Sequence, residues 1–223
     1  MQPQLLVADF AGTMFLEEGA VVVAYRQAFA AFDIDASDAD IAARRGASKR
    51  AVFEELAART RPVDEARAVA GQALAVFETA LRDEYSSGSV QEIPGAGNAA
   101  RHLREAGLRI ALASGFDRPL VDLLLDQLGW HDLFDLTIAG NDVAAGRPAP
   151  AIIHHAMARL AVDDVATVAV VGDTPLDLQA GMNARTGWVI GVLSGAHGVE
   201  TLGTTRHTHL LTSVAVLPAL FGL

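Results

Sequence analysis

The chain has 223 residues, 51% of them hydrophobic, which is enough to bury a sizeable core in one large domain or one domain with an insert. Its formal net charge of -10 repels phosphate backbones and anionic membranes, so we expect neither nucleic acid nor a membrane as a partner. Cysteine is absent, which excludes disulfides and thiol chemistry, and the first residues do not resemble a signal peptide, so we expect a cytoplasmic location.

The first predicted strand covers residues 5–10, "LLVADF". Its apolar run lacks strict alternation, which is typical of a parallel strand covered on both faces. The run nevertheless contains a carboxylate near its end, Asp9, and the residue two places later is Ala11. A buried strand that ends on an acidic residue indicates a chemical role for that residue.

Residues 19–85 contain predicted helices and no predicted strand. The helices are expected at 20–32, in a short segment after Ser37, at 49–59 and at 63–82. The flanking stretches "LEEGA" and "SSGSVQEIPGAG" supply the Gly, Ser and Pro of hinges. We therefore predict an all-helical cap domain at residues 16–87, called the cap segment below, inserted into a core formed by residues 1–15 and 88–223.

Two features of the cap segment allow more than one interpretation. Lys49 is the only lysine among 17 basic residues, and lysine, unlike arginine, can lose its proton and act as a nucleophile. Chance retention of this lysine on a solvated helix is the alternative. The first helix is apolar at Val21, Val22, Val23, Tyr25 and Phe29, which allows either a homodimer through the cap or packing within it.

After the cap segment, strands and helices alternate. Strands are expected at 109–113, 136–139, 167–171 and 188–192, with a weaker one near 208–211. Helices are expected at 97–106, 118–128, 151–160 and 176–184. This alternation predicts a doubly wound α/β fold with a parallel, Rossmann-like sheet.

Four predicted strand ends carry polar residues. They are Asp9, Ser114 with Gly115, Arg147 in "GNDVAAGRP", and Asp173 with Asp177 in "VVGDTPLD". Ligands of an open parallel sheet bind beyond the carboxyl ends of its strands, so we expect these residues to form one site.

This combination suits phosphoryl transfer through an acyl phosphate. A carboxylate nucleophile divides the reaction into two displacements, and a divalent cation such as Mg²⁺ must bridge the carboxylates and the phosphorus group. Asp9 and Asp173 can supply those carboxylates. Ser114 and Gly115 can donate hydrogen bonds to the phosphorus oxygens, and Arg147 adds a fixed positive charge.

In order and spacing, "DFAGT", "ASG", "GRPAP" and "VGDTPLD" resemble the four motifs of the haloacid dehalogenase (HAD) superfamily. The position of the insert is similar to that of the small helical cap of the first subfamily. The resemblance implies that Asp9 is the nucleophile and a Mg²⁺ ligand, and that Asp173 and the carbonyl oxygen of Ala11 are further ligands. Asp177 would support these ligands without contacting the ion, although an ordinary helix-face carboxylate is an alternative. We assign phosphate or substrate binding to Ser114, Gly115, Ala11, Gly12 and Thr13.

Ala11 departs from most phosphatases of the superfamily, which have a second aspartate there as general acid. Phosphonoacetaldehyde hydrolases (phosphonatases) have alanine at this position, G-R-P in the third motif, and a cap lysine. "DFAGT", "AGRPAP" and "RRGASK" are similar to this branch. In phosphonatases the lysine condenses with the aldehyde, and the protonated imine accepts the electrons of the breaking C–P bond. The missing acid is then not needed, and Lys49 would be catalytic.

The resemblance is incomplete in the cap segment. Phosphonatases have a histidine three residues after the lysine, where this chain has Val52, and a methionine where it has Arg45. The basic residues Arg44, Arg45, Lys49 and Arg50 would alternatively form a loop that recognises a substrate carboxylate or a second phosphate. We assign Arg45 to substrate binding.

The leading hypothesis is a Mg²⁺-dependent hydrolase that cleaves a phosphorus bond of a small phosphorylated or phosphonate metabolite through an aspartyl phosphate. A phosphonatase-like C–P substrate is favoured. One alternative is a phosphomonoester phosphatase acting, for example, on phosphoglycolate or a sugar phosphate. The other is a catalytically silent binding module on the same fold.

Overall fold

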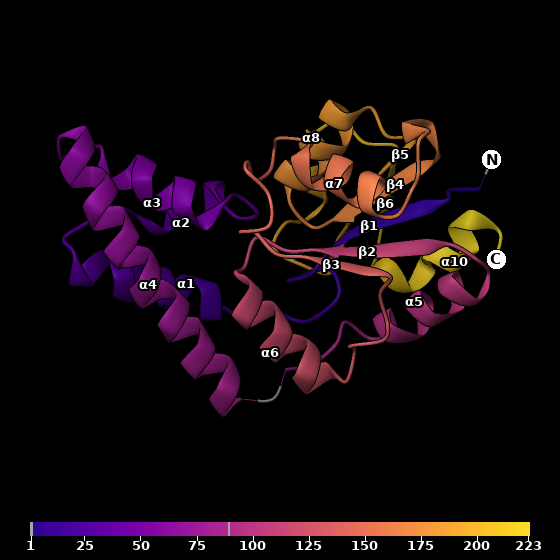
Figure 1. Ribbon diagram of the computed structural model, residues 1–223, viewed down its shortest axis with the longest axis horizontal. Coiled ribbons are helices and arrows are strands. Elements are labelled where there is room, and N and C mark those ends of the chain that lie inside the picture. The colour runs from indigo at the N-terminus through magenta and orange to yellow at the C-terminus, as the bar shows by residue number, and fades with distance from the viewer. Residues whose placement is uncertain (1, 89) are drawn as a thin grey trace.

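Six parallel strands form one sheet in the order β3-β2-β1-β4-β5-β6 in the computed structural model, which describes residues 2–88 and 90–223 (Figure 1). The strands are β1 (Leu5–Asp9), β2 (Arg109–Ala113), β3 (Leu136–Ile138), β4 (Val168–Gly172), β5 (Trp188–Val192) and β6 (His209–Leu211). The predicted parallel sheet is confirmed, and the weak strand near residue 208 is its edge strand β6.

Alternate residues of β1 face opposite sides of the sheet. Leu5 and Val7 pack with α7 (Ala151–Arg159) and α8 (Pro175–Ala184). Leu6 and Ala8 belong to a second core that includes α5 (Ala96–Glu105) and α6 (Arg118–Leu128). Helices therefore cover both faces (Figure 1), which confirms the doubly wound fold and explains why the first four residues of β1 are all apolar.

The strand order changes direction between β1 and β4. From β1 the chain builds outward through β2 and β3, then crosses to β4 on the other side of β1 and continues to β5 and β6. Ala8 of β1 pairs with Val171 of β4, and Asp9 pairs with Ala113 of β2. The carboxyl ends of β1, β2 and β4 therefore meet at the switch point, where open α/β sheets bind ligands.

The cap segment contains α1 (Ala20–Ala31), α2 (Asp38–Ala43), α3 (Lys49–Ala57) and α4 (Val63–Ser87), which lie together at one end of the sheet (Figure 1). This arrangement is consistent with a helical cap. Helix α4 extends five residues beyond the predicted end at residue 82, because its buried stripe continues through Leu81 and Tyr85 at helical spacing. Residue 89, in the predicted second hinge, lies outside the described residues.

Four aromatic rings form the interior of the cap segment. Tyr25 and Phe29 of α1 pack with Phe53 of α3 and Phe77 of α4, with ring centroids 4.6 to 5.6 Å apart. The apolar stripe of α1 is therefore largely used within the chain, although Val23 is 47% exposed. The stripe gives no support for the homodimer, which stays a prediction.

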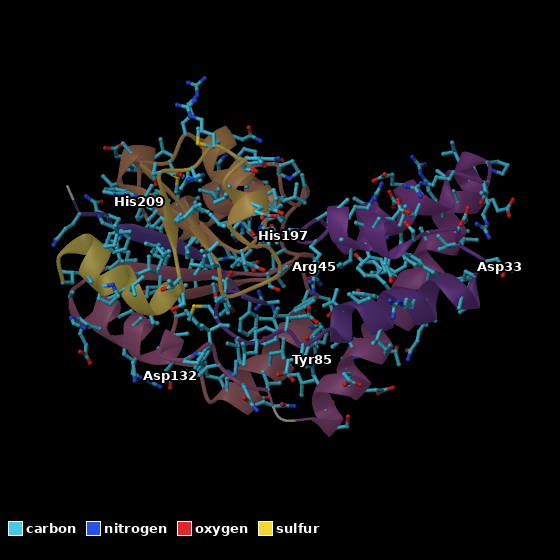
Figure 2. All side chains as sticks on the ribbon, turned by 180° about the vertical axis from the view of Figure 1, so that it is seen from behind. Asp33, Arg45, Tyr85, Asp132, His197 and His209 are labelled. Carbon is cyan, nitrogen blue, oxygen red and sulfur yellow. The ribbon has the colours of Figure 1, made fainter. Side chains whose placement is uncertain are left out.

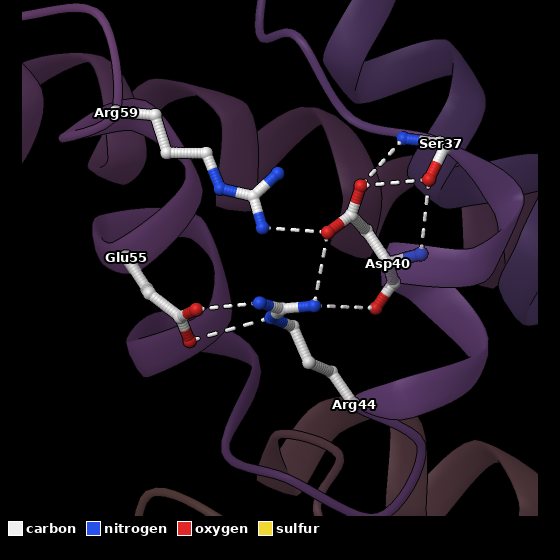
Figure 3. Close-up of polar contacts among 5 residues, drawn as sticks. All are labelled: Ser37, Asp40, Arg44, Glu55 and Arg59. Atoms are coloured by element: carbon white, nitrogen blue, oxygen red, sulfur yellow. Dashed lines mark hydrogen bonds and ion pairs between the residues drawn. The ribbon is translucent and has the colours of Figure 1, made fainter.

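An ion-pair network joins α2 to α3 (Figure 3). Arg44 donates to the carbonyl oxygen of Asp40 at 3.0 Å and to the Asp40 carboxylate at 3.2 Å, and it also pairs with Glu55. Asp40 in turn accepts hydrogen bonds from Arg59 and Ser37. These contacts hold Arg44 within the cap segment.

Several short elements in the second half of the chain were not predicted. They are α9 (Val199–Leu202) and α10 (Leu217–Phe221), with single 3-10 turns at Val165–Thr167 and Val214–Val216. Among the described residues, none of the helices combines the length and apolar character needed to cross a bilayer.

Candidate active site

Three buried carboxylates converge at the switch point of the sheet. Asp9 is the last residue of β1, Asp173 directly follows β4, and Asp177 lies in the first turn of α8. One oxygen from each lies within 4.8 Å of the others, and each residue is at most 8% exposed. The sequence analysis expected these residues to meet, and the structure brings them together.

Arg147 is fixed among these carboxylates. Its Nη1 lies 2.7 Å from Asp9 Oδ1, its Nε lies 3.0 Å from Asp177 Oδ1, and its Nη2 donates to the carbonyl oxygen of Ala113 at 3.0 Å. The residue is 8% exposed. Arg147 is therefore a preorganised positive charge beside Asp9, as the sequence predicted, and it also links the ends of β1 and β2 to α8.

The protein alone only partly compensates the negative charges of the Asp9 and Asp173 carboxylates. Burial raises the pKa of Asp9 well above its usual range; Arg147 opposes this shift, and the charges of Asp177 and Asp173 add to it. Burial, followed by the charge of Asp177, raises the pKa of Asp173 to about 6. Buried carboxylate oxygens this close together suit a hard divalent cation, which would relieve their repulsion.

Both carboxylate oxygens of Asp177 already have partners within the protein. Its Oδ2 accepts hydrogen bonds from Thr174 Oγ1 at 2.6 Å and from the Thr174 backbone N–H at 3.1 Å, and its Oδ1 faces Arg147. These contacts form the capping box that begins α8. We therefore keep the prediction that Asp177 supports the metal ligands without being one itself.

The residues after Asp9 divide into two groups. Ala11 and Gly12 line a cavity beside Asp9, whereas Thr13 is fully buried and is not among the described lining residues. Thr13 Oγ1 donates to Asp173 Oδ1 at 3.3 Å, so its position suits orientation of Asp173 better than the predicted phosphate contact. Gly12 has φ +80°, and a Cβ there would lie 2.5 Å from Asp173 Oδ2, so glycine is required.

Ser114 and Gly115 follow β2 and line the same cavity. Ser114 is 3% exposed, and its Oγ accepts the backbone N–H of Phe116 at 3.1 Å. This hydrogen bond fixes the hydroxyl oxygen while leaving its proton free to donate. Both residues are placed where a phosphorus oxygen can be bound.

Sequence reasoning missed the loop that follows β5. Ser194, Gly195 and Ala196 line the cavity; Ser194 Oγ donates to the carbonyl oxygen of Gly12 at 3.0 Å, and the Ala196 N–H donates to Asp173 Oδ2 at 2.7 Å. The sequence did contain a signal for this loop, because its residues "SGAHG" (194–198) come shortly after the carboxyl end of the strand predicted at 188–192. This loop therefore holds one carboxylate oxygen of Asp173, and Thr13 holds the other.

The cavity extends from the sheet to the cap segment and has a volume of about 270 Å³. The core contributes Asp9, Arg147 and Asp173, and the cap segment contributes Arg45 and Lys49. Figure 2 shows Arg45 at the junction between the two parts. The predicted nucleophile and the only lysine therefore line one small cavity.

The amine of Lys49 lies between aromatic rings of the two parts. Its Nζ is 5.5 Å from the ring centroid of Tyr25 in α1 and 5.9 Å from that of Phe116 after β2. Burial, followed by the charge of Arg147, lowers the pKa of Lys49 to about 8. A useful fraction of the amine is therefore unprotonated near neutral pH, so the structure does not fit an ordinary solvated lysine.

The loop before Lys49 touches the core. Gly46 has φ +83°, and a Cβ on it would lie 2.5 Å from Thr174 Oγ1. A Cβ on Gly146, next to Arg147, would lie 2.8 Å from the Cβ of Ser48. The cap segment therefore closes over the carboxylates, and glycine permits this approach at Gly46.

Comparison with known proteins supports this description. A curated phosphonoacetaldehyde hydrolase from Bacteroides fragilis is 36% identical over 138 residues, which are 59% of this chain and 51% of that protein. Another from Syntrophobacter fumaroxidans is 28% identical over 205 residues, covering 84% of this chain and 71% of the relative. The chain spans about half the length of the first of these relatives.

A phosphonoacetaldehyde hydrolase like protein from Oleispira antarctica has the same fold. Its crystal structure matches with a TM-score of 0.84 at 19% identity, covering 100% of this chain and 92% of that one. The family model of haloacid dehalogenase-like hydrolases matches residues 3–185. With its doubly wound sheet and the convergence of the four motifs at one cavity, the chain belongs to the haloacid dehalogenase-like hydrolases.

Proposed function

We propose that this hydrolase cleaves the C–P bond of a small phosphonate that carries a carbonyl group, with Asp9 as the nucleophile and Lys49 as the amine that activates the carbonyl. The observation that carries this proposal is the shared cavity of Asp9 and Lys49. Its volume of about 270 Å³ suits a small metabolite that reaches both residues.

The proposed reaction begins at Lys49. Its neutral amine adds to the substrate carbonyl and, with uptake of a proton and loss of water, forms a protonated imine. The lowered pKa of Lys49 supports this step, because the free amine is the nucleophile. The positive imine nitrogen then becomes the acceptor for the electrons of the C–P bond.

Asp9 acts next. Its carboxylate oxygen attacks phosphorus, the C–P bond breaks, and its electron pair forms an enamine on the organic fragment. The enamine takes up a proton on carbon, and water hydrolyses the resulting imine to free Lys49. A second water hydrolyses the aspartyl phosphate to phosphate. The departing carbon needs no proton from residue 11 at the moment of cleavage, which accounts for Ala11.

The remaining residues have supporting roles in this proposal. A bound Mg²⁺, held by Asp9, Asp173 and the carbonyl oxygen of Ala11, would neutralise charge between the nucleophile and the phosphorus group. Ser114 and Gly115 would donate hydrogen bonds to phosphorus oxygens. Arg147 orients Asp9 through their 2.7 Å contact, and its charge favours the ionised form of Asp9 against the opposing effect of burial.

Trapping with borohydride tests the proposal. With phosphonoacetaldehyde as the probe, reduction should attach the organic fragment to Lys49, and mass spectrometry of peptides should locate it. Lys49→Arg keeps the charge but cannot form the imine, so trapping and phosphate release should both be lost. Phosphate release that survives Lys49→Arg, or faster release from phosphate esters than from any phosphonate, would replace this proposal with the phosphatase alternative.

A further inference from the structure

The three arginines around Gly46 have different surroundings. Arg44 is held in the network of Figure 3. Arg50 is exposed and lines an adjoining cavity of about 600 Å³, which shares Lys49 with the cavity of Asp9 but does not include Asp9 itself. Arg45 lines the cavity that contains Asp9 and Lys49. Of these three, Arg45 alone lines the cavity that contains Asp9, so one arginine of the predicted cluster stands at this site.

Glu17 holds Arg45 in place. Its Oε2 pairs with Arg45 Nη2, and its Oε1 accepts the backbone N–H groups of Gly19 at 2.9 Å and Val21 at 3.0 Å. The Glu17 side chain is only 6% exposed, whereas that of Arg45 is 23% exposed. Glu17 is thus fixed at the start of α1, and the guanidinium it holds remains partly open to the cavity.

Arg45 keeps donors available for a ligand. Within residues 2–88 and 90–223, its Nε and Nη1 groups make no hydrogen bond, because the contact with Glu17 uses Nη2 alone. A guanidinium with free N–H donors can form charge-assisted hydrogen bonds with a carboxylate. Glu17 already offsets part of its charge, which suits a singly charged group better than a second, doubly charged phosphate. Glu18 also lines the cavity, but its exposure to solvent screens its charge.

We infer that Arg45 binds a carboxylate on the organic part of the substrate, and that the substrate is a phosphonate carrying a 2-oxo acid group. This inference rests on the proposed function, because Lys49 must attack the oxo carbon. Arg45 and Lys49 both come from the cap segment, four residues apart, and line the same cavity, so we place the carboxylate next to that carbon. The balanced reaction is phosphono-2-oxo acid plus water giving phosphate and the 2-oxo acid.

Two compounds form a matched pair for the test. Phosphonoacetaldehyde and 3-phosphonopyruvate share the C–P bond and the neighbouring carbonyl, and they differ by a carboxylate on the carbonyl carbon. We expect wild-type kcat/KM, measured by phosphate release, to be about 10- to 100-fold higher for 3-phosphonopyruvate, the range of a charge-assisted hydrogen-bonded pair. Equal or better turnover of phosphonoacetaldehyde would overturn the inference and leave the proposed function intact.

Variants test whether Arg45 causes the preference for 3-phosphonopyruvate. Arg45→Met should abolish the preference while phosphonoacetaldehyde is still cleaved, and Arg45→Lys should restore part of it. Arg50→Met, which changes an arginine outside this cavity, should leave the ratio unchanged. A ratio unaffected by Arg45→Met would overturn the inference. If the wild type releases phosphate from neither compound, the proposed function fails as well, and the two failures are thereby distinguished.

Discussion

The two ends of the cavity are built in different ways. At the end proposed to bind phosphorus, Asp9, Ser114 and Asp173 stand at the ends of neighbouring strands, and buried hydrogen bonds and Arg147 fix the two aspartates. At the end proposed to bind the organic part, Arg45 and Lys49 come from a loop and the first residue of a helix in the cap segment. The comparison teaches that the residues proposed to break the bond are tied to the sheet, whereas the residues proposed to select the substrate are carried by a separate segment.

Removing the nucleophile tests the phosphorus end and should have the largest effect. Asp9→Asn keeps the size of the side chain but removes the attacking oxygen, so we expect phosphate release to fall at least about 10⁴-fold. Asp163→Asn, at an exposed aspartate, is the matched control and should be neutral. Residual activity within tenfold of wild type would show that Asp9 is not the nucleophile.

The pH dependence of trapping tests the organic end. Because burial lowers the pKa of Lys49 to about 8, the reactive neutral amine becomes more abundant as pH rises through that value. About 1% of the Lys49 amine is unprotonated at pH 6. The rate of borohydride trapping should therefore rise about 50- to 100-fold from pH 6 to pH 9 and then level off. A rate that keeps rising tenfold per unit to pH 10 would indicate an ordinary lysine.

The contacts of Glu17 with Gly19, Val21 and Arg45 should affect the stability of the protein rather than the reaction at phosphorus. Glu17→Ala removes the acceptor of the Gly19 and Val21 N–H groups and the partner of Arg45. We expect the free energy of unfolding, from urea titration, to fall by about 1–3 kcal/mol. Glu18→Ala, at the exposed neighbour, should change it by less than about 0.5 kcal/mol. Equal effects of the two variants would contradict the anchoring role of Glu17.

The smallest effect is expected for the network in Figure 3. Arg44→Ala breaks pairs with Asp40 and Glu55 that are partly open to solvent, so a loss of about 1 kcal/mol in unfolding free energy is expected. Because Arg44 does not line the cavity, the ratio of activities on the two phosphonates should not change. A changed ratio would mean that this network, and not Arg45 alone, sets the preference.

The sequence predicted most of the fold because buried parallel strands and helices with regular apolar spacing are local signals. The predicted strand at 109–113 matches β2, and Asp9 and Asp173 meet where the sheet order requires. The contact of Thr13 with Asp173 could not be predicted, because it joins residues 160 positions apart. The same holds for the three arginines around Gly46, whose directions depend on a positive φ turn and on partners in other helices.

The close approach of Gly46 to Thr174 has a consequence for how this protein can diversify. Thr174 caps the helix that holds Asp177, so a side chain added at Gly46 would disturb both halves of the cavity together. Its neighbour Arg45 lines the cavity and, within residues 2–88 and 90–223, pairs with Glu17 and with no other carboxylate. Gly46 is therefore constrained by packing against the core, whereas the adjacent Arg45 is not. If Arg45 contacts the substrate as proposed, a substitution there would change the accepted metabolite without disturbing the residues proposed for hydrolysis.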